Sequence, residues 1–219
     1  MAEERAAPAL GLAVADPAPL GLGAFALTTF VLSAHNAGWA PDLIWVGLAL
    51  FYGGMAQFLA GMWEFKNKNT FGSTAFASYG GFWLSLGGFV VLVLFGKIPA
   101  SVSITHALAW FLVAFAIFNS YMLIASTRVN LAVFGVFLTL EVTEILLFIG
   151  NFQNQAAGQG LVQIGGIVGV ITALVAWYAS FAGVVNSMSP TRVLPVGGPM
   201  WGASPIAPRA GSPLPRTQS

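Results

Sequence analysis

Two carboxylates lie close together within an otherwise apolar part of the second half of the chain. Glu141 and Glu144 belong to the run Leu140-Glu141-Val142-Thr143-Glu144, with apolar stretches on both sides. Residues three apart on a helix are neighbours, and two carboxyl groups in close contact can hold one proton between them. This pair could therefore bind a proton, or it could add negative charge to a site.

A second candidate site lies where the first apolar stretch begins. Asp16 is followed by Pro17, and this pair is typical of a helix start, because Asp is a good N-cap and Pro is tolerated in a first helical turn. The free N–H groups and the positive potential at a helix N-terminus can also hold a carboxylate. Both interpretations stay open, namely a well-formed helix start and an anion-binding position.

A third candidate is the polar segment that runs from Glu64 to Gly80. Charged, amide, hydroxyl and glycine residues extend from it into an apolar stretch, which a plain loop would not need. Non-helical backbone at membrane depth persists only where water or protein satisfies its hydrogen bonds. We therefore expect a partly unwound segment here that lines an aqueous cavity.

The composition requires a membrane around these candidates. The 219 residues are 57% hydrophobic and 7% charged, whereas soluble domains are about 25% charged, so the chain cannot cover itself with a polar surface. The net charge of +1 gives no indication of nucleic acid as a partner, and the absence of cysteine excludes disulfides and thiolate metal sites. No His-Glu-x-x-His motif occurs, so neither an enzyme nor a cofactor is expected.

The apolar stretches predict an all-α integral membrane protein with six transmembrane helices. Each stretch has roughly the 20 residues needed to cross the bilayer, and none alternates in polarity as a membrane β-strand would. The predicted spans are residues 20–40, 43–65, 75–95, 104–126, 131–150 and 161–185.

These spans form one membrane domain, residues 16–188, between two tails. We expect residues 1–15 to be a disordered N-terminal tail without the features of a cleavable signal. Residues 189–219 are rich in Pro, Gly and Ser and are expected to be mostly disordered, with contact to the bundle near residues 194–198.

The distribution of basic residues predicts the orientation. The two tails and the even-numbered loops contain all but one of them, and Lys97 alone lies in the alternate loops. Because cytoplasmic segments are enriched in Lys and Arg, both termini are expected in the cytoplasm, as an even number of spans requires. The basic residues on that side are Arg5, Lys66, Lys68, Arg128, Arg192, Arg209 and Arg216.

Several motif blocks resemble the acetate uptake transporter family, the YaaH-type succinate–acetate permeases. The blocks occur in order from residue 16 to residue 197, which is almost the whole membrane domain. They are Asp-Pro-Ala-Pro-Leu-Gly-Leu at 16–22, Thr28-Thr29, His35-Asn36, Tyr-Gly-Gly-Met-Ala-Gln at 52–57, Ala60-Gly61, Asn-Thr-Phe-Gly at 69–72, Thr-Ala-Phe at 74–76, Ser-Tyr-Gly at 78–80, Phe82-Trp83, Ile-Gly-Asn at 149–151 and Val-Leu-Pro-Val-Gly at 193–197.

The resemblance implies a ring-shaped hexamer of six-helix protomers, each with its own pathway for acetate, related monocarboxylates or succinate. It also implies a narrow waist formed by a Phe, a Tyr and a Leu, which the motifs place at Phe25, Tyr79 and Leu140. An apolar waist with one hydroxyl is suited to a gate that excludes bulk water. The Leu140 assignment requires an ungapped fifth span.

Helix geometry places further polar residues near this waist. At about 100° per residue, Thr29 and Asn36 fall near the face of Phe25, and Gln57 shares a face with Glu64. Hydrogen bonding between helices is the alternative role for these residues. The candidate polar residues of the pathway are Asp16, Thr28, Thr29, Asn36, Gln57, Asn69 and Thr70.

The chain departs from the family at Asp16, where Asn is typical, and at Glu141 and Glu144, where uncharged residues are typical. A charged carboxylate at the bilayer centre costs at least about 2.5–3.5 kcal/mol, so the pair needs an explanation. It could be protonated and packed between helices or subunits, couple proton movement to acid transport, or shift selectivity toward neutral or cationic solutes.

The expected function is therefore a channel or proton-linked transporter for acetate and succinate. The alternative is a channel for a small neutral solute such as urea or an amide, which the two glutamates keep open. A scaffold without transport would need neither the polar faces nor the waist. The short tails favour a bacterial inner membrane over a eukaryotic plasma membrane.

Overall fold

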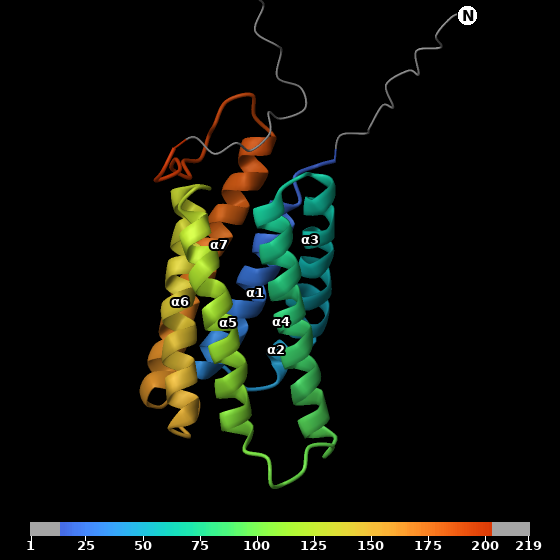
Figure 1. Ribbon diagram of the computed structural model, residues 1–219, viewed down its shortest axis with the longest axis vertical. Coiled ribbons are helices and arrows are strands. Elements are labelled where there is room, and N and C mark those ends of the chain that lie inside the picture. Colours follow the sequence, from blue (N-terminus) through green and yellow to red (C-terminus); the bar gives the residue numbers. More distant parts are fainter. Residues whose placement is uncertain (1–13, 203–219) are drawn as a thin grey trace, which may run out of the picture.

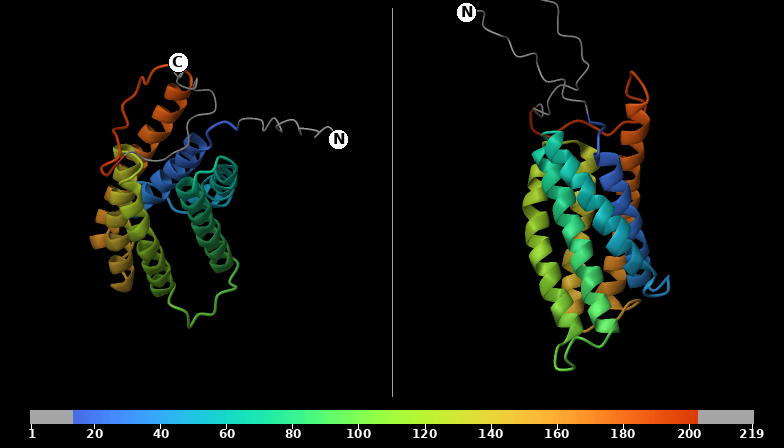
Figure 2. Two further views of the ribbon diagram at one scale, coloured as in Figure 1. Left: turned by 45° about the horizontal axis from the view of Figure 1, so that its top comes forward. Right: turned by 90° about the vertical axis from the view of Figure 1, so that its right-hand side faces the viewer.

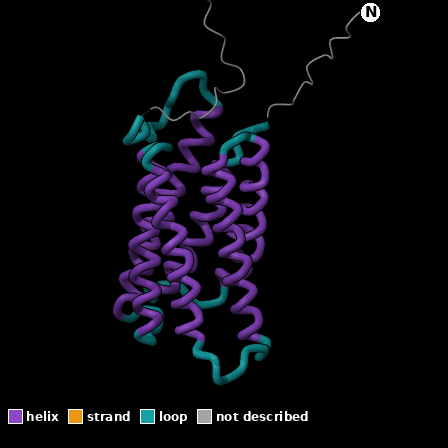
Figure 3. Tube along the Cα trace, in the orientation of Figure 1, coloured by secondary structure: helices purple, strands orange, loops and turns teal. Residues whose placement is uncertain are grey.

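The computed structural model describes residues 14–202, and all regular secondary structure in that range is helical. Six helical segments are long and apolar enough to span a membrane, which confirms the predicted all-α fold (Figures 1 and 3). The elements are α1 (Ala18–Asn36), α2 (Ile44–Leu50), η1 (Phe51–Ala56), α3 (Gln57–Lys66), α4 (Thr70–Leu94), α5 (Ile104–Ser126), α6 (Leu131–Phe152) and α7 (Gly160–Ser187).

The prediction that the segment from Glu64 to Gly80 is partly unwound is wrong, because the third span is regular helix from Thr70 onward. Asn69 caps this helix, and its Oδ1 accepts a hydrogen bond from Gly72 N at 3.0 Å. The buried Ser73 hydroxyl donates to Thr70 O. Local hydrogen bonds therefore satisfy Asn69 and Ser73 without any unwinding, and the helix begins five residues before the predicted span.

The second span contains a π-helical turn that sequence periodicity did not predict. The segment α2–η1–α3 runs continuously from Ile44 to Lys66, with the turn at η1. At Gly53 an added Cβ would lie 2.5 Å from Thr28 Oγ1, so the glycine allows η1 to approach α1 closely. Such turns insert a residue into an α-helix and shift the register of the residues that follow.

Helix α1 lies between two groups of helices, as the tilted view shows (Figure 2, left). It packs against α7 on one side and against η1 and α3 on the other. Helices α5, α6 and α7 pack in sequence on the first side, and α3 packs against α4 on the second. A site enclosed by both groups must therefore use side chains from α1, α3, α4 and α6.

The small residues of the sixth span serve packing within this bundle. An added Cβ at Gly165 would lie 2.9 Å from Leu147 Cδ2 of α6, and one at Gly166 would collide with the backbone of Ala37 just after α1. Close backbone approach of this kind is the usual role of glycine in membrane helices.

The segment after α7 turns back over the ends of α5, α6 and α7. Ala132 N donates to Val196 O at 3.0 Å, and Met200 N donates to Thr127 O at 2.7 Å. Asn186 Oδ1 accepts from both Val193 N and Leu194 N. We call residues 193–200 the strap. The remainder of the predicted tails, residues 1–13 and 203–219, lies outside the described residues.

Candidate functional site

The three residues predicted to form a waist meet in the interior of the bundle. Phe25 of α1, Tyr79 of α4 and Leu140 of α6 are all at least nine-tenths buried. The rings of Phe25 and Tyr79 meet edge to face, with centroids 5.7 Å apart and an interplanar angle of 67°. This is a favoured geometry for aromatic pairs, so the contact is stabilising as well as space-filling.

A cavity of about 80 Å³ ends at these three side chains. This volume is several times the roughly 10–15 Å³ that one water molecule requires, so a few waters or one small solute could fit. Its walls are mostly apolar. The lining residues are Ala18, Leu22, Phe25, Gln57, Glu64, Asn69, Phe71, Gly72, Ala75, Phe76, Tyr79, Val129, Val133, Val136, Phe137 and Leu140.

The waist forms the inner limit of the cavity. On α1 the lining runs from Ala18 to Phe25, and on α4 it runs to Tyr79. On α6 it ends at Leu140. All three helices begin at the end of the bundle where the described chain begins and ends (Figure 1). The cavity therefore extends from that end toward the middle and stops at Phe25, Tyr79 and Leu140.

Gln57 and Glu64 provide the buried polar groups of the cavity, and they share one face of α3, as the helix arithmetic predicted. Gln57 is 2% exposed and Glu64 is 0% exposed. Gln57 Oε1 and Glu64 Oε1 have no hydrogen-bond partner, whereas Glu64 Oε2 accepts from Asn67 Nδ2 at 3.2 Å. Unpaired buried oxygens are costly, so both positions are suited to water or a polar solute.

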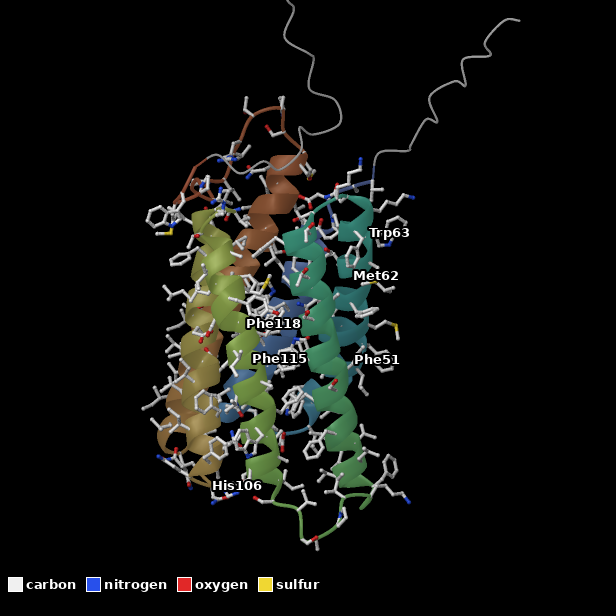
Figure 4. All side chains as sticks on the ribbon, in the orientation of Figure 1. Phe51, Met62, Trp63, His106, Phe115 and Phe118 are labelled. Atoms are coloured by element: carbon white, nitrogen blue, oxygen red, sulfur yellow. The ribbon has the colours of Figure 1, made fainter. Side chains whose placement is uncertain are left out.

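An aromatic cluster surrounds Tyr79 toward α5 and α6. Its ring lies 5.9 Å from that of Phe115 and 5.5 Å from that of Phe118, and both phenylalanines extend from α5 toward α4 (Figure 4). Phe82 follows one turn later on α4, at 6.0 Å. In contrast, Trp63 on α3 points away from the bundle and is 50% exposed, as a lipid-facing side chain would be (Figure 4).

Several predicted polar residues do not reach the cavity. Thr28 is fully buried, but its hydroxyl donates to Ala24 O within its own helix. Thr29 is buried with an unpaired hydroxyl. Asn36 ends α1, eleven residues beyond Phe25 or roughly 16 Å along the helix. Thr70 is exposed, in contrast to Asn69, which does line the cavity.

Asp16 accepts a local hydrogen bond at the start of α1. Its Oδ1 accepts from Ala18 N at 3.0 Å, although the helix is bounded at Pro17. Asp16 therefore satisfies one free N–H group at the helix start, but it precedes the N-cap position, which is Pro17 and not Asp16 as the first interpretation expected.

A polar network beside the waist includes a residue that the sequence analysis missed. The Tyr79 hydroxyl lies 2.9 Å from Asn119 Oδ1 and 3.3 Å from Glu144 Oε1. Asn119 Nδ2 donates to Phe137 O at 3.0 Å and to Glu141 Oε2 at 2.6 Å. Asn119 is an isolated amide in an apolar span, and that feature is the signal that could have identified it.

The two glutamates occupy different surroundings on α6. Glu144 is 2% exposed, contacts Tyr79 through Oε1 and leaves Oε2 unpaired. Glu141 is partly buried and accepts from Asn119 Nδ2 and, at 2.8 Å, from Ser120 Oγ. Glu144 is therefore the member of the pair joined to the waist.

A bundle of six membrane-length helices around a cavity that stops at an apolar waist defines the architecture of a channel or transporter for small solutes. The chain belongs to the GPR1/FUN34/yaaH family, whose model matches residues 2–197. This match confirms the resemblance found in the motif blocks.

Some of the similar proteins carry transport names. Acetate permease A of Emericella nidulans is 41% identical over 83% of this chain and 65% of its own length. Succinate-acetate/proton symporter SatP of Escherichia coli is 37% identical over 84% of this chain and 96% of its own length. The solved structure of the bacterial acetate channel SatP matches with a TM-score of 0.78 and 36% identity, over 84% of this chain and 99% of that one.

The chain spans less than two thirds of the length of the first fungal relatives that it matches, between 62% and 65%. It spans almost all of the bacterial relative.

Proposed function

We propose that this protein transports acetate and related small carboxylates, including succinate, across a membrane. The observation that carries the proposal is the cavity that ends at Phe25, Tyr79 and Leu140. A pathway closed by apolar side chains admits small, partly desolvated solutes and excludes bulk water. The names of the E. nidulans and E. coli relatives support acetate and succinate as the solutes.

The electrostatics of the cavity favour a carboxyl group that carries a proton or is shielded by donors. Helix α4 begins beside the cavity, because Asn69 and Gly72 line it, and a helix N-terminus contributes positive potential. The carboxyl group of Glu64 lies in the same wall, and its negative charge when ionised opposes this positive potential. A neutral acid, or an anion that binds with a proton, would avoid repulsion by Glu64.

We infer the orientation of the protein in the membrane from the basic residues at the two ends of the bundle. Lys66, Lys68, Arg128 and Arg192 lie in the segments at the end where α4 and α6 begin and α3, α5 and α7 end, and Lys97 lies in the connection at the opposite end. We therefore place both termini, and the cavity, on the cytoplasmic side.

A homohexamer in a bacterial inner membrane completes the proposal. The near-complete match to E. coli SatP supports a bacterial cell membrane. Positions on α4 remain open for close contact with another copy, because an added Cβ at Gly81 or Gly88 would meet nothing within 4 Å. Small residues of this kind allow helices of adjacent subunits to approach.

Uptake of labelled acetate into proteoliposomes tests the function. The purified protein is reconstituted, uptake is measured at pH 6 and pH 8, and uptake into protein-free vesicles is subtracted. Unlabelled succinate, lactate and urea serve as competitors. Saturable uptake that carboxylates inhibit, and urea does not, is the expected result. Flux of urea without flux of acetate would instead assign the cavity to a small neutral solute.

A further inference from the structure

The polar network beside the waist contains one more acceptor than it has hydrogens to supply. Asn119 Oδ1 can only accept, and the amide orientation is set by its neighbours, because Nδ2 faces two acceptors, Phe137 O and Glu141 Oε2. The Tyr79 hydroxyl, 2.9 Å from Asn119 Oδ1, is thus the donor of that bond. Its single hydrogen is then used.

While Tyr79 donates to Asn119, the shorter of its two contacts, the contact between Tyr79 and Glu144 needs a hydrogen from Glu144. The hydroxyl oxygen lies 3.3 Å from Glu144 Oε1. If Glu144 were ionised in this arrangement, the Tyr79 oxygen and Glu144 Oε1 would face each other at a buried position with no hydrogen between them, and Oε2 would also lack a partner. An unpaired buried charge of this kind is strongly unfavourable, whereas a carboxylic acid completes the network as a donor to Tyr79.

We propose that Glu144 is a proton-binding site that controls passage through the waist by way of the Tyr79 hydroxyl. In the protonated state, Glu144 donates to Tyr79, and Tyr79 donates to Asn119. On release, the O–H bond of Glu144 breaks and its proton passes to water. The Tyr79 O–H bond is retained, and the hydroxyl rotates from Asn119 to the new carboxylate.

This rotation changes the waist in two ways. It removes the bond that holds Tyr79 to α5, and it leaves a negative charge one hydrogen bond away from a residue that lines the cavity. A carboxylate solute is repelled by that charge. The protonated state is therefore the one that allows carboxylates to pass, and passage slows as Glu144 loses its proton.

The surroundings of Glu144 contain few other groups that titrate. Glu141 lies on α6 itself, Tyr79 on α4, and the α5 residue Tyr121 is 54% exposed. On α7, which packs along α6, Tyr178 donates instead to Pro195 O of the strap segment. The histidines of α1 and α5 occur one residue before the end and two residues after the start of their helices. Tyr79 and Glu141 are thus the titratable groups of the network.

Infrared difference spectroscopy tests the proton site independently of transport. The C=O stretch of a protonated carboxylic acid, identified by its shift in deuterated water, is followed while the pH of the reconstituted protein is raised. Glu64→Gln provides the background, because Glu64 is the other buried carboxyl group among residues 14–202. We expect the band to persist in Glu64→Gln and in Glu64→Gln/Glu141→Gln, and to vanish in Glu64→Gln/Glu144→Gln. A band that vanishes with Glu141 and survives without Glu144 would overturn the proposal.

Acetate exchange, with equal pH on both sides of the membrane, tests the control of passage and rests on the proposed function. Wild-type exchange should fall by about tenfold per pH unit above the midpoint of the titration. Glu144→Gln, which keeps a neutral donor, should remove this fall, whereas Glu141→Gln should keep it. An unchanged fall in correctly assembled Glu144→Gln would refute the control. If the wild type exchanges no acetate, the proposed function fails, and the infrared band alone decides the proton site.

Discussion

The rings of Phe25 and Tyr79 pack edge to face at a centroid distance of 5.7 Å, and this contact joins α1 to α4 at the inner limit of the cavity. Tyr79 also contacts Phe118 of α5 and reaches Glu144 of α6 through its hydroxyl. One side chain thus links the packing of the waist to the polar network behind it. Changes on either side of Tyr79 should have separable effects on size selection and on pH dependence.

Truncation of the waist should relax the selection of solutes by size. Phe25→Ala removes the ring that meets Tyr79, so we expect bulkier monocarboxylates such as lactate to enter several-fold faster, with acetate uptake retained. Uptake of labelled lactate into proteoliposomes measures this. Leu22→Ala, one turn earlier on the same cavity wall, is the matched control and should leave the ratio of lactate to acetate uptake unchanged. An equal ratio in both variants would contradict a waist at Phe25.

The amide of Gln57 should matter for uptake and not for stability. Gln57→Leu removes a buried oxygen that has no partner, so the melting temperature should stay constant or rise. If the amide contacts the solute, acetate uptake should fall by about tenfold, which corresponds to about 1.4 kcal/mol. Gln163→Leu on α7, outside the cavity, is the control for the loss of an amide. Equal uptake by the two variants would exclude a role for Gln57 in the pathway.

Two adjacent glycines of α4 should differ sharply in their tolerance of a methyl group. An added Cβ at Gly80 would lie 2.6 Å from the backbone nitrogen of Phe58 on α3, whereas one at Gly81 would meet nothing within 4 Å. Gly80→Ala should therefore lower stability by about 1–3 kcal/mol, because the helices must separate. Gly81→Ala should not disturb packing within one protomer, so any loss of stability that it causes reports on contact with another subunit. Thermal unfolding in detergent, followed by size-exclusion chromatography, compares them.

If Gly81→Ala lowers stability more than Gly80→Ala does, the tight contact lies on the face of α4 that carries Gly81. In that case Gly81 would contact another subunit in the assembled protein, which the single chain does not show. The comparison therefore also reports on the proposed hexamer.

The strap should loosen when Asn186, one of the two α7 side chains that bond to it, is removed, because Tyr178 alone then remains bonded to it. Asn186 accepts from Val193 N and Leu194 N, and its Nδ2 donates to Leu194 O at 2.9 Å. Asn186→Ala should cost about 1–3 kcal/mol and make the strap a site of rapid limited proteolysis. Ser187→Ala is the control, because that hydroxyl bonds only to Val184 O within α7. Equal cleavage rates in the two variants would show that Asn186 does not hold the strap.

The composition and the motif blocks determined the membrane class, the number of spans and the family. These features follow from hydrophobic length and from local residue order, both of which are written along the chain. Spans at 104–126 and 131–150 were predicted within two residues of α5 and α6. Gln57 and Glu64 were placed on one face because both lie after the π turn, where the helical period is regular.

Tertiary structure alone decided which polar residues belong together. Asn119 approaches Tyr79 from a position 40 residues away, and Glu144 from 65 residues away. No periodicity within one helix reveals such contacts, since they depend on how α4, α5 and α6 are rotated against each other. For the same reason Asn36 shares a helical face with Phe25 yet lies far from the cavity. A helical face is a local property, whereas a cavity exists only where several helices enclose it.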